Sequence, residues 1–298
     1  MSKNKINVII IVINPSSGAG KEVDYEPIIK RYSDLYGYKY MIYYTSGTGD
    51  SRKLKNHIDE FKPEMVMAVG GDGTINLVAS LIIDTQIILG IIPGGSANGL
   101  AFNLNIPTNF EYALKINLEA QIKSIDAILI NNEHYCFHLS DLGLNARVVK
   151  RFEKEGSKGL LGYGKQLFKE LLTKKTYFSY SLKTDNEFKK SKAEMLVITN
   201  AHSFGTGVKI NPAGELSDGL FEIVVIKPYP WWFVLTFIIA GFSGHLDKMQ
   251  SVNIFKTHNA EIKLEESQEF QIDGEIIGKT DSVKIELLRN SLKVVYNV

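Results

Sequence analysis

The sequence of 298 residues predicts two domains, an α/β domain with a parallel sheet followed by an antiparallel β-sandwich domain. Apolar runs alternate with helical patterns up to residue 124, which is typical of a parallel sheet with helices on both faces. After that residue, short strand-like runs separated by turn signals dominate, as in a β-sandwich. The chain is also long enough to bury the cores of two domains of ordinary size.

We expect the N-terminal domain to span residues 1–124, while residues 291–298 could belong to either domain. Its predicted strands, in chain order, are Val8–Ile13, Tyr38–Tyr44, Met65–Val69 and Ile87–Ile92. Its predicted helices are Tyr25–Leu35, Arg52–Phe61, Thr74–Ile83 and a helix containing Phe110–Leu118. Because the carboxyl ends of parallel strands meet at one edge, the loops that follow these strands are the expected ligand site.

The C-terminal domain is expected to span residues 125–290. Its predicted strands are Ser124–Ile130, Tyr135–Leu139, Tyr177–Lys183, Met195–Thr199, Leu220–Ile226, Ala260–Leu264, Glu269–Ile272 and Val283–Leu288. Two helical insertions, Val148–Lys175 and Trp231–Met249, interrupt this β pattern.

Composition favours a globular protein in a reducing compartment. The net charge of +1 gives no overall bias toward nucleic acid, and 44% of the residues are hydrophobic. Cys136 is the only cysteine, so no intrachain disulfide is expected. The apolar run Trp231–Gly241 is about half the length needed to cross a bilayer, so we do not expect an integral membrane protein.

Three loops rich in glycine, serine and asparagine follow the predicted strands. The first contains Asn14, Pro15, Ser16, Ser17, Gly18 and Lys21, the second Gly70, Gly71, Asp72, Gly73, Thr74 and Asn76, and the third Gly95, Ser96 and Asn98. Glycines let backbone amides approach a phosphate, and a helix N-terminus behind them favours an anion. A carboxylate there suggests either a divalent cation or a ribose hydroxyl as its partner. The alternative for the serines and asparagines is helix N-capping.

These motifs resemble the three nucleotide-binding motifs of the diacylglycerol kinase catalytic-domain family, which includes bacterial lipid kinases and sphingosine kinases. The matching segments are Asn14-Pro15-x-Ser17-Gly18, Gly70-Gly71-Asp72-Gly73-Thr74-x-Asn76 and Pro93-x-Gly95-Ser96-x-Asn98. The resemblance continues in the same order through Asp141–Ala146, Asn211–Leu220 and Gln271–Glu275, nearly to the end of the chain. It implies an NAD-kinase-like α/β domain and a lipid-substrate domain, with the active site in the crevice between them.

The resemblance implies an enzyme that moves the γ-phosphate of ATP onto a lipid hydroxyl, with Mg²⁺. The implied ATP-binding residues are those of the three loops together with Thr45. Asp273 and Glu275 are the implied general base. The implied metal ligands are Asp72 and, at a second and structural site, Glu215, Asp218 and Leu220. From the residues alone, Asp273-Gly274-Glu275 also fits a hairpin turn with solvated charges.

Two positions depart from the family pattern, since many relatives have Glu where Leu77 stands and Asp where Gly99 stands. Acceptor specificity depends on the shape of the pocket, so the sequence leaves the acceptor open among diacylglycerol-, phosphatidylglycerol- and sphingosine-type lipids. Two other functions remain in view, an NAD-kinase-like small-molecule kinase and a non-catalytic regulator that binds nucleotide and lipid.

A lipid acceptor implies a cytoplasmic protein held peripherally at the inner face of the membrane, with a homodimer as one option. Residues 147–175 hold nine basic residues against three acidic ones, which suits an anionic membrane. The alternative is a surface helix whose apolar stripe packs on the core. Lys165 is a further candidate for a phosphate contact. The run Pro230–Ile239 is a second candidate for lipid contact, or else a helix that covers the β-domain. His134 and His138 lack a third nearby ligand, so no zinc site is expected.

Overall fold

The computed structural model describes residues 6–17, 24–144, 146–147, 177–204, 207–230 and 234–297. The chain divides into two compact units, unit 1 with residues 1–125 and 290–298, and unit 2 with residues 126–289. The chain passes from unit 1 to unit 2 within strand β5 (Gln121–Ile130) and returns within β14 (Glu275–Tyr296). Residues 291–298, which the sequence left unassigned, therefore belong to unit 1.

Unit 1 contains the predicted parallel sheet. Its strands pair in the order β2 (Lys39–Tyr44), β1 (Val8–Ile13), β3 (Met65–Gly70), β4 (Ile88–Pro93) and the end of β14. Every residue of β3 and β4 is buried. This is expected where helices cover both faces of a parallel sheet, and it explains why these strands read as continuous apolar runs.

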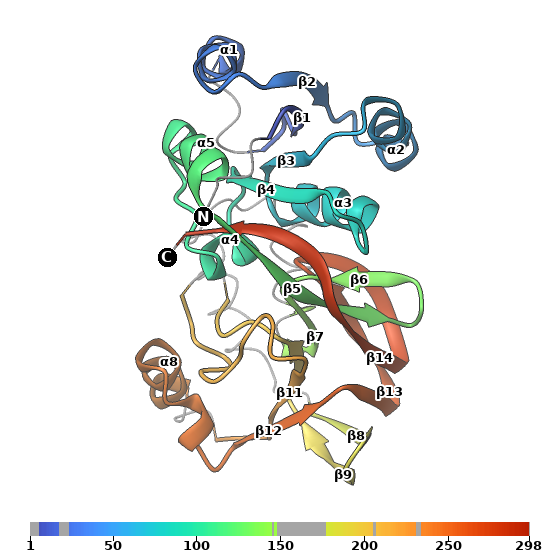
Figure 1. Cartoon of the computed structure of the whole chain (residues 1–298). Helices are drawn as coiled ribbons and strands as arrows, with labels where there is room; N and C mark the ends of the chain where they lie inside the picture. Colours follow the sequence, from blue (N-terminus) through green and yellow to red (C-terminus); the bar gives the residue numbers. More distant parts are fainter. Residues whose placement is uncertain are drawn as a thin grey trace. The chain divides into compact units, whose positions relative to one another are not determined.

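In the described part of unit 1, the helices around this sheet are α1 (Tyr25–Tyr36), α2 (Asp50–Phe61), α3 (Asp72–Ile82), α4 (Gly99–Asn103) and α5 (Phe110–Glu119). In Figure 1, α1 and α5 lie on one side of the strands, and α2 and α3 on the other. Contacts agree with the first pair, since the rings of Tyr25 and Phe110 lie 4.4 Å apart and Arg31 pairs with Glu111. The short helix α4 was not predicted.

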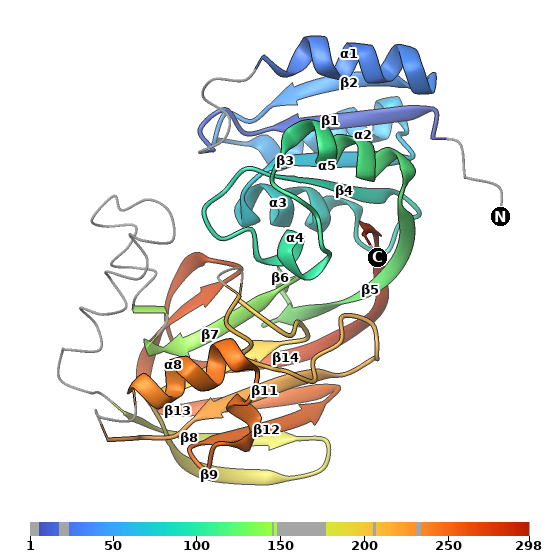
Figure 2. The ribbon, with the colours of Figure 1, turned by 90° about the vertical axis from the view of Figure 1, so that its left-hand side faces the viewer.

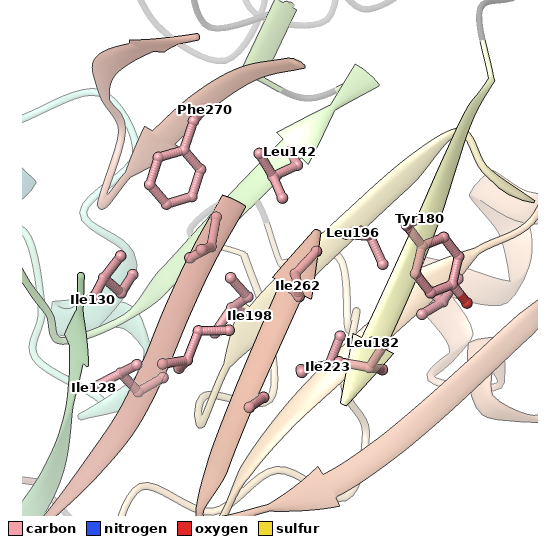
Figure 3. Close-up of a cluster of buried hydrophobic side chains, with 14 of the residues drawn as sticks. Ile128, Ile130, Leu142, Tyr180, Leu182, Leu196, Ile198, Ile223, Ile262 and Phe270 are labelled. Carbon is pink, nitrogen blue, oxygen red and sulfur yellow. The ribbon is translucent and has the colours of Figure 1, made fainter. Parts of the chain in front are cut away.

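Unit 2 contains the predicted antiparallel sandwich. Its remaining strands are β6 (His134–Cys136), β7 (Leu139–Gly143), β8 (Phe178–Thr184), β9 (Phe188–Ala193), β10 (Met195–Thr199), β11 (Phe221–Ile226), β12 (Val252–Thr257) and β13 (Asn259–Ile272). One layer runs β12-β11-β10-β7, and the other contains β9, β8, β13 and β14, with β5 and β6 beyond β14. Buried side chains from both layers form one core, among them Ile128, Leu142, Leu182, Ile198 and Ile262 (Figure 3).

A second apolar cluster lies on the other face of the β12-β11-β10-β7 layer. Helix α8 (Val234–Ser243) and the short 3₁₀ helix Leu246–Lys248 pack there, and α8 lies over β11 and β12 in Figure 2. The Phe237 ring stacks on Tyr229 at 5.7 Å. Within the predicted helix Trp231–Met249, the described elements, α8 and the 3₁₀ helix, thus cover the β-domain, as one of the two alternatives proposed, although Ile239 and Phe242 remain exposed.

Several predicted elements needed correction. Strands β9 and β12 were not predicted. In β9, three lysines hide any apolar alternation. Ala260–Leu264 and Glu269–Ile272 form one strand, β13, with a register shift between Lys263 and Gln268. The predicted helix Val148–Lys175, with Lys165, lies outside the described residues, as do Asn145 and Trp231–Phe233. Among the helices that the structure describes, none is long and apolar enough to span a bilayer.

Candidate nucleotide and phosphoryl-transfer sites

The three predicted loops of unit 1 are bonded to one another at the carboxyl ends of β1, β3 and β4. The Asn14 amide N–H donates to the carbonyl of Val69 at 3.0 Å, and its side-chain amide donates to Thr74 Oγ1 at 3.3 Å. The Gly94 N–H donates to the carbonyl of Gly70 at 2.7 Å. The second loop is therefore the central one, joined to the first on one side and to the third on the other.

The glycines at this edge permit very close packing between the second and third loops. A Cβ placed on Gly95 would lie 2.5 Å from the Cα of Gly71, and one on Gly70 would lie 2.4 Å from Thr74 Oγ1. Sequence reasoning attributed these glycines to ligand approach. The structure adds a reason internal to the protein, because any side chain at Gly95 would push the two loops apart.

Asp72, in the first turn of α3, holds the third loop in place. Its Oδ1 accepts a hydrogen bond from the Gly99 N–H at 2.7 Å. Gly99 is one of the two positions where this chain departs from the family pattern, and here its backbone serves as the donor. A carboxylate oxygen is also a ligand type that Mg²⁺ prefers, so Asp72 fits the chemistry of the predicted metal ligand. Its contact with Mg²⁺ or ribose stays a prediction.

Asn98 occupies the N-cap position of α4, but its side chain closes the third loop instead of capping the helix. Its Oδ1 accepts from the Gly95 N–H, and its side-chain amide donates to the Gly95 carbonyl, both at 2.8 Å. Asn98 has a φ of 51° and makes no side-chain cap bond to α4. Ser96 is exposed beside it, and Asn76 Oδ1 accepts from Ser80 at 3.2 Å.

The first loop is built around Asn14. Its Oδ1 accepts from the Ser16 N–H at 2.9 Å, and its carbonyl accepts from Ser17 Oγ at 2.8 Å. Pro15 is exposed in this turn. The predicted ligands Gly18 and Lys21 lie outside the described residues.

The loop after β2, which carries Thr45, has an anchor that sequence reasoning missed. Thr45 donates its N–H to the Ile13 carbonyl at 2.9 Å, which joins this loop to β1. Asp50 accepts from the Ser46 N–H at 3.0 Å and from the Gly47 N–H at 2.7 Å. Burial disfavours the Asp50 carboxylate, but these bonds and the one from Tyr43 outweigh it and lower its pKa to about 2. The available signal was an aspartate just inside a helix, four residues after a serine.

In unit 2, the two predicted general-base residues lie at a tight turn, Asp273 within it and Glu275 directly after it. Ile272 pairs with Glu275, and the two residues between them have positive φ angles, 48° for Asp273 and 89° for Gly274. Positive φ at both central positions defines a type I′ turn, which Asp-Gly favours. The hairpin alternative is therefore right about the backbone. Glu275 is exposed at the start of β14.

The Asp273 carboxylate is not solvated, because it is buried beneath three backbone amides. It accepts from the N–H groups of Phe137 at 2.9 Å, His138 at 3.0 Å and Leu139 at 3.1 Å. The Cys136 thiol lies 3.4 Å from Oδ1, and burial, followed by the charge of Asp273, raises the pKa of this thiol. These bonds explain why the predicted strand Tyr135–Leu139 is broken between β6 and β7.

Two buried polar residues support the same turn. The Gly274 N–H donates to Gln271 Oε1 at 2.7 Å, and Gln271 Nε2 donates to Asp141 Oδ2. Gln271 and Asp141 also face each other in the β13–β7 register. Sequence reasoning recorded both residues as parts of motifs and gave neither a role.

The predicted second metal site already contains a lysine. Asp218 Oδ1 accepts from the Leu220 N–H at 3.0 Å, and Oδ2 lies 3.6 Å from Lys256 Nζ. That ammonium also lies 2.8 Å from Glu222 Oε1, across the β11–β12 pair. Burial raises the pKa of Glu222, and the hydrogen bond to Glu222 raises the pKa of Lys256. Within the described parts of the chain, no group of three or more His, Cys, Asp or Glu side chains could hold a metal.

Lys256 therefore provides positive charge where the resemblance implies Mg²⁺ beside Glu215, Asp218 and Leu220, and that metal site stays a prediction. We expect Lys256→Met to cost about 1–3 kcal/mol of unfolding free energy, because it leaves the buried Glu222 without its hydrogen-bond donor. We also expect the melting temperature of the ATP-free wild type to be unchanged by EDTA, whereas the variant is stabilised by Mg²⁺.

Differential scanning fluorimetry with and without Mg²⁺ checks this, with Lys263→Met as the control because Lys263 forms an exposed pair with Glu261. A wild-type protein that loses stability in EDTA and regains it with Mg²⁺ would contradict the lysine assignment.

Comparisons with known proteins agree with the two-domain fold. Residues 8–130 match the family described as "Diacylglycerol kinase catalytic domain", and residues 140–296 match the "YegS C-terminal NAD kinase beta sandwich-like domain". A "Probable lipid kinase YegS-like" of Yersinia enterocolitica is 27% identical over 254 residues, covering 82% of this chain and 83% of that protein. An uncharacterized Synechocystis protein is 31% identical over 240 residues; these are 77% of this chain but only 54% of that protein, so the match spans about half its length.

The fold also has solved counterparts. A structure described as "a putative diacylglycerol kinase from Bacillus anthracis str. Sterne" superposes with a TM-score of 0.83, covering 99% of this chain and 97% of that one. Its sequence is 22% identical, so this likeness concerns the fold.

Proposed function

The chain belongs to the diacylglycerol kinase catalytic-domain family, and from this premise we propose that it is an ATP-dependent lipid kinase. The observation that carries the proposal is the bonding of three phosphate-type loops at one edge of the unit 1 sheet. Asn14 joins the first loop to Thr74 of the second, and Asp72 joins the second loop to Gly99, directly after the third. The Gly95 N–H closes the third loop by donating to Asn98. Phosphoryl transfer depends mainly on positioning and on neutralising oxygen charge, and such a loop cluster supplies the positioning.

Unit 1 is proposed to bind ATP. Helix α3 begins within the second loop, so the positive end of its dipole would favour the phosphate groups of ATP there. The exposed Ser96 hydroxyl and the Thr45 loop would contact the rest of the nucleotide. Asp72 would hold Mg²⁺, which supplies neutralisation of the charge that develops on the phosphate oxygens.

Unit 2 is proposed to supply the general base. The acceptor hydroxyl must lose its proton as its oxygen attacks the γ-phosphorus, and the Asp273–Glu275 pair would receive that proton. Three backbone amides fix the Asp273 carboxylate, and the type I′ turn places Glu275 two residues further on. The position of the Asp273 carboxylate is thus fixed by its bonds, and the turn sets where the backbone of Glu275 lies relative to it.

The proposed acceptor is the hydroxyl group of a membrane lipid of the diacylglycerol, phosphatidylglycerol or sphingosine type. Such an acceptor implies action at the inner face of the membrane from the cytoplasm. A homodimer is compatible with this function but is not required by it.

Radiolabelled ATP and Mg²⁺ with a panel of diacylglycerol, phosphatidylglycerol, sphingosine and NAD test the function. We expect label in one of the lipids, and at least a hundredfold less of it with Asp72→Ala. Label in NAD alone would indicate a small-molecule kinase and overturn the proposal. Binding of ATP without transfer to any acceptor would indicate a regulator and would also overturn it.

A further inference from the structure

The outward face of the β9-β8-β13-β14 layer in unit 2 is rich in lysine. Side chains alternate along a strand, so when Leu182 and Ile262 point into the core, their neighbours point away from it. The outward lysines are Lys183, Lys190, Lys192, Lys263 and Lys284, all exposed, and we name this surface the lysine face. Glu261, Glu265 and Glu286 share it, which leaves an excess of two positive charges.

The lysines act together on the acid at their centre. Glu261 forms an ion pair with Lys263 at 2.8 Å and lies opposite Lys183 and Lys284 in the strand register. The hydrogen bond and charge of Lys263, followed by the charges of Lys183 and Lys284, lower the pKa of Glu261. The face therefore has a positive local field although the whole chain has a net charge of only +1.

Exposed aromatic rings lie at the β9 margin of the lysine face. Phe188 is 61% exposed and Tyr177 is 55% exposed. The Lys190 ammonium lies 5.7 Å from the centre of the Phe188 ring, and that of Lys192 lies 5.0 Å from the Tyr177 ring. Exposed rings beside cations suit the headgroup layer of a membrane, where the ring enters the interface and the cation meets phosphate.

We propose that the lysine face docks unit 2 onto the anionic surface of a lipid bilayer. The proposal rests on the proposed function, because a kinase with a lipid acceptor must reach the bilayer. Lysines on an edge strand also prevent pairing with other chains, and among the described strands β9 pairs only with β8. That role does not account for Lys183, Lys263 and Lys284, which lie on strands paired on both sides. A nearly neutral chain argues against nucleic acid as the partner.

Cosedimentation with vesicles tests the docking surface. The wild type should bind vesicles of phosphatidylglycerol and phosphatidylcholine, bind pure phosphatidylcholine weakly, and lose affinity as salt rises. Each lysine near such a surface is worth roughly a fivefold change in partitioning, so Lys190→Gln with Lys192→Gln should weaken binding roughly 25-fold. The matched control, Lys53→Gln with Lys115→Gln, removes two exposed lysines of unit 1 and should bind like the wild type.

Equal binding by the Lys190/Lys192 variant and the wild type would overturn the proposal, as would a wild type that binds duplex DNA but not anionic vesicles. Loss of binding in Ile239→Ser with Phe242→Ser, but not in the lysine variant, would assign the contact to α8 and overturn it too.

Kinase assays separate the docking proposal from the proposed kinase function. The lysine variant should phosphorylate lipid in neutral detergent micelles at the wild-type rate and lose activity only on anionic vesicles. Vesicle binding that depends on the lysines, without transfer to any lipid, would uphold docking and overturn the proposed kinase function.

Discussion

Asp273→Asn is expected to lower both the stability of the protein and its rate of phosphoryl transfer. The carboxylate accepts three backbone N–H groups in a buried position, whereas asparagine keeps only one acceptor oxygen and adds a donor there. Leaving buried amides unsatisfied costs about 2–3 kcal/mol. For a unit of this size that corresponds to a fall of roughly 5–10 °C in melting temperature. Loss of the base should reduce the turnover number by about 10²–10⁴.

Glu275→Gln is the matched control, because Glu275 is exposed and flanks the same turn. It should reduce turnover to a similar extent without changing the melting temperature. Thermal unfolding and steady-state kinetics on both variants separate anchoring from proton transfer. If Asp273→Asn melts like the wild type, the anchoring role is wrong; if Glu275→Gln keeps full activity, Glu275 is not part of the base.

Gly95→Ala is expected to abolish most nucleotide binding. The new Cβ would lie 2.5 Å from the Cα of Gly71, and a backbone atom cannot move aside as a flexible side chain can. Overpacking of this kind costs about 1–3 kcal/mol, and separating the loops by a fraction of an ångström misplaces the phosphate-binding amides. A misplacement near 1 Å can cost about a hundredfold in rate, so we expect a loss of that order in kcat/KM for ATP.

A graded control comes from the facing glycine. A Cβ on Gly71 would lie 3.2 Å from the Cα of Gly95, so Gly71→Ala should have the same effect at smaller magnitude. Ser96→Ala leaves the backbone contact intact and should retain stability while testing the hydroxyl alone. ATP titration by calorimetry, with thermal unfolding alongside, checks the series. Equal ATP affinity in Gly95→Ala and the wild type would show that loop packing does not set the site.

Much of the fold was predictable because its signals are local. The strands Val8–Ile13 in unit 1 and Met195–Thr199 in unit 2 begin and end where their apolar runs do. Their boundaries follow from burial on both faces, which needs no alternation. Strand β9 could not be found this way, since its outward side chains are lysines and its place in the sheet is set by pairing with β8.

The sequence by itself determined the two-domain fold, the three loops and the Asp273-Gly274 turn, because each depends on the periodicity or the backbone preferences of neighbouring residues. Only the tertiary structure decided what their polar groups contact. Asp273 meets the amides of residues 137–139, Asp72 meets Gly99, and Lys256 takes the place beside Asp218. Partners so far apart in sequence leave no local pattern, since it is the pairing of strands and the packing of loops that bring them within hydrogen-bonding distance.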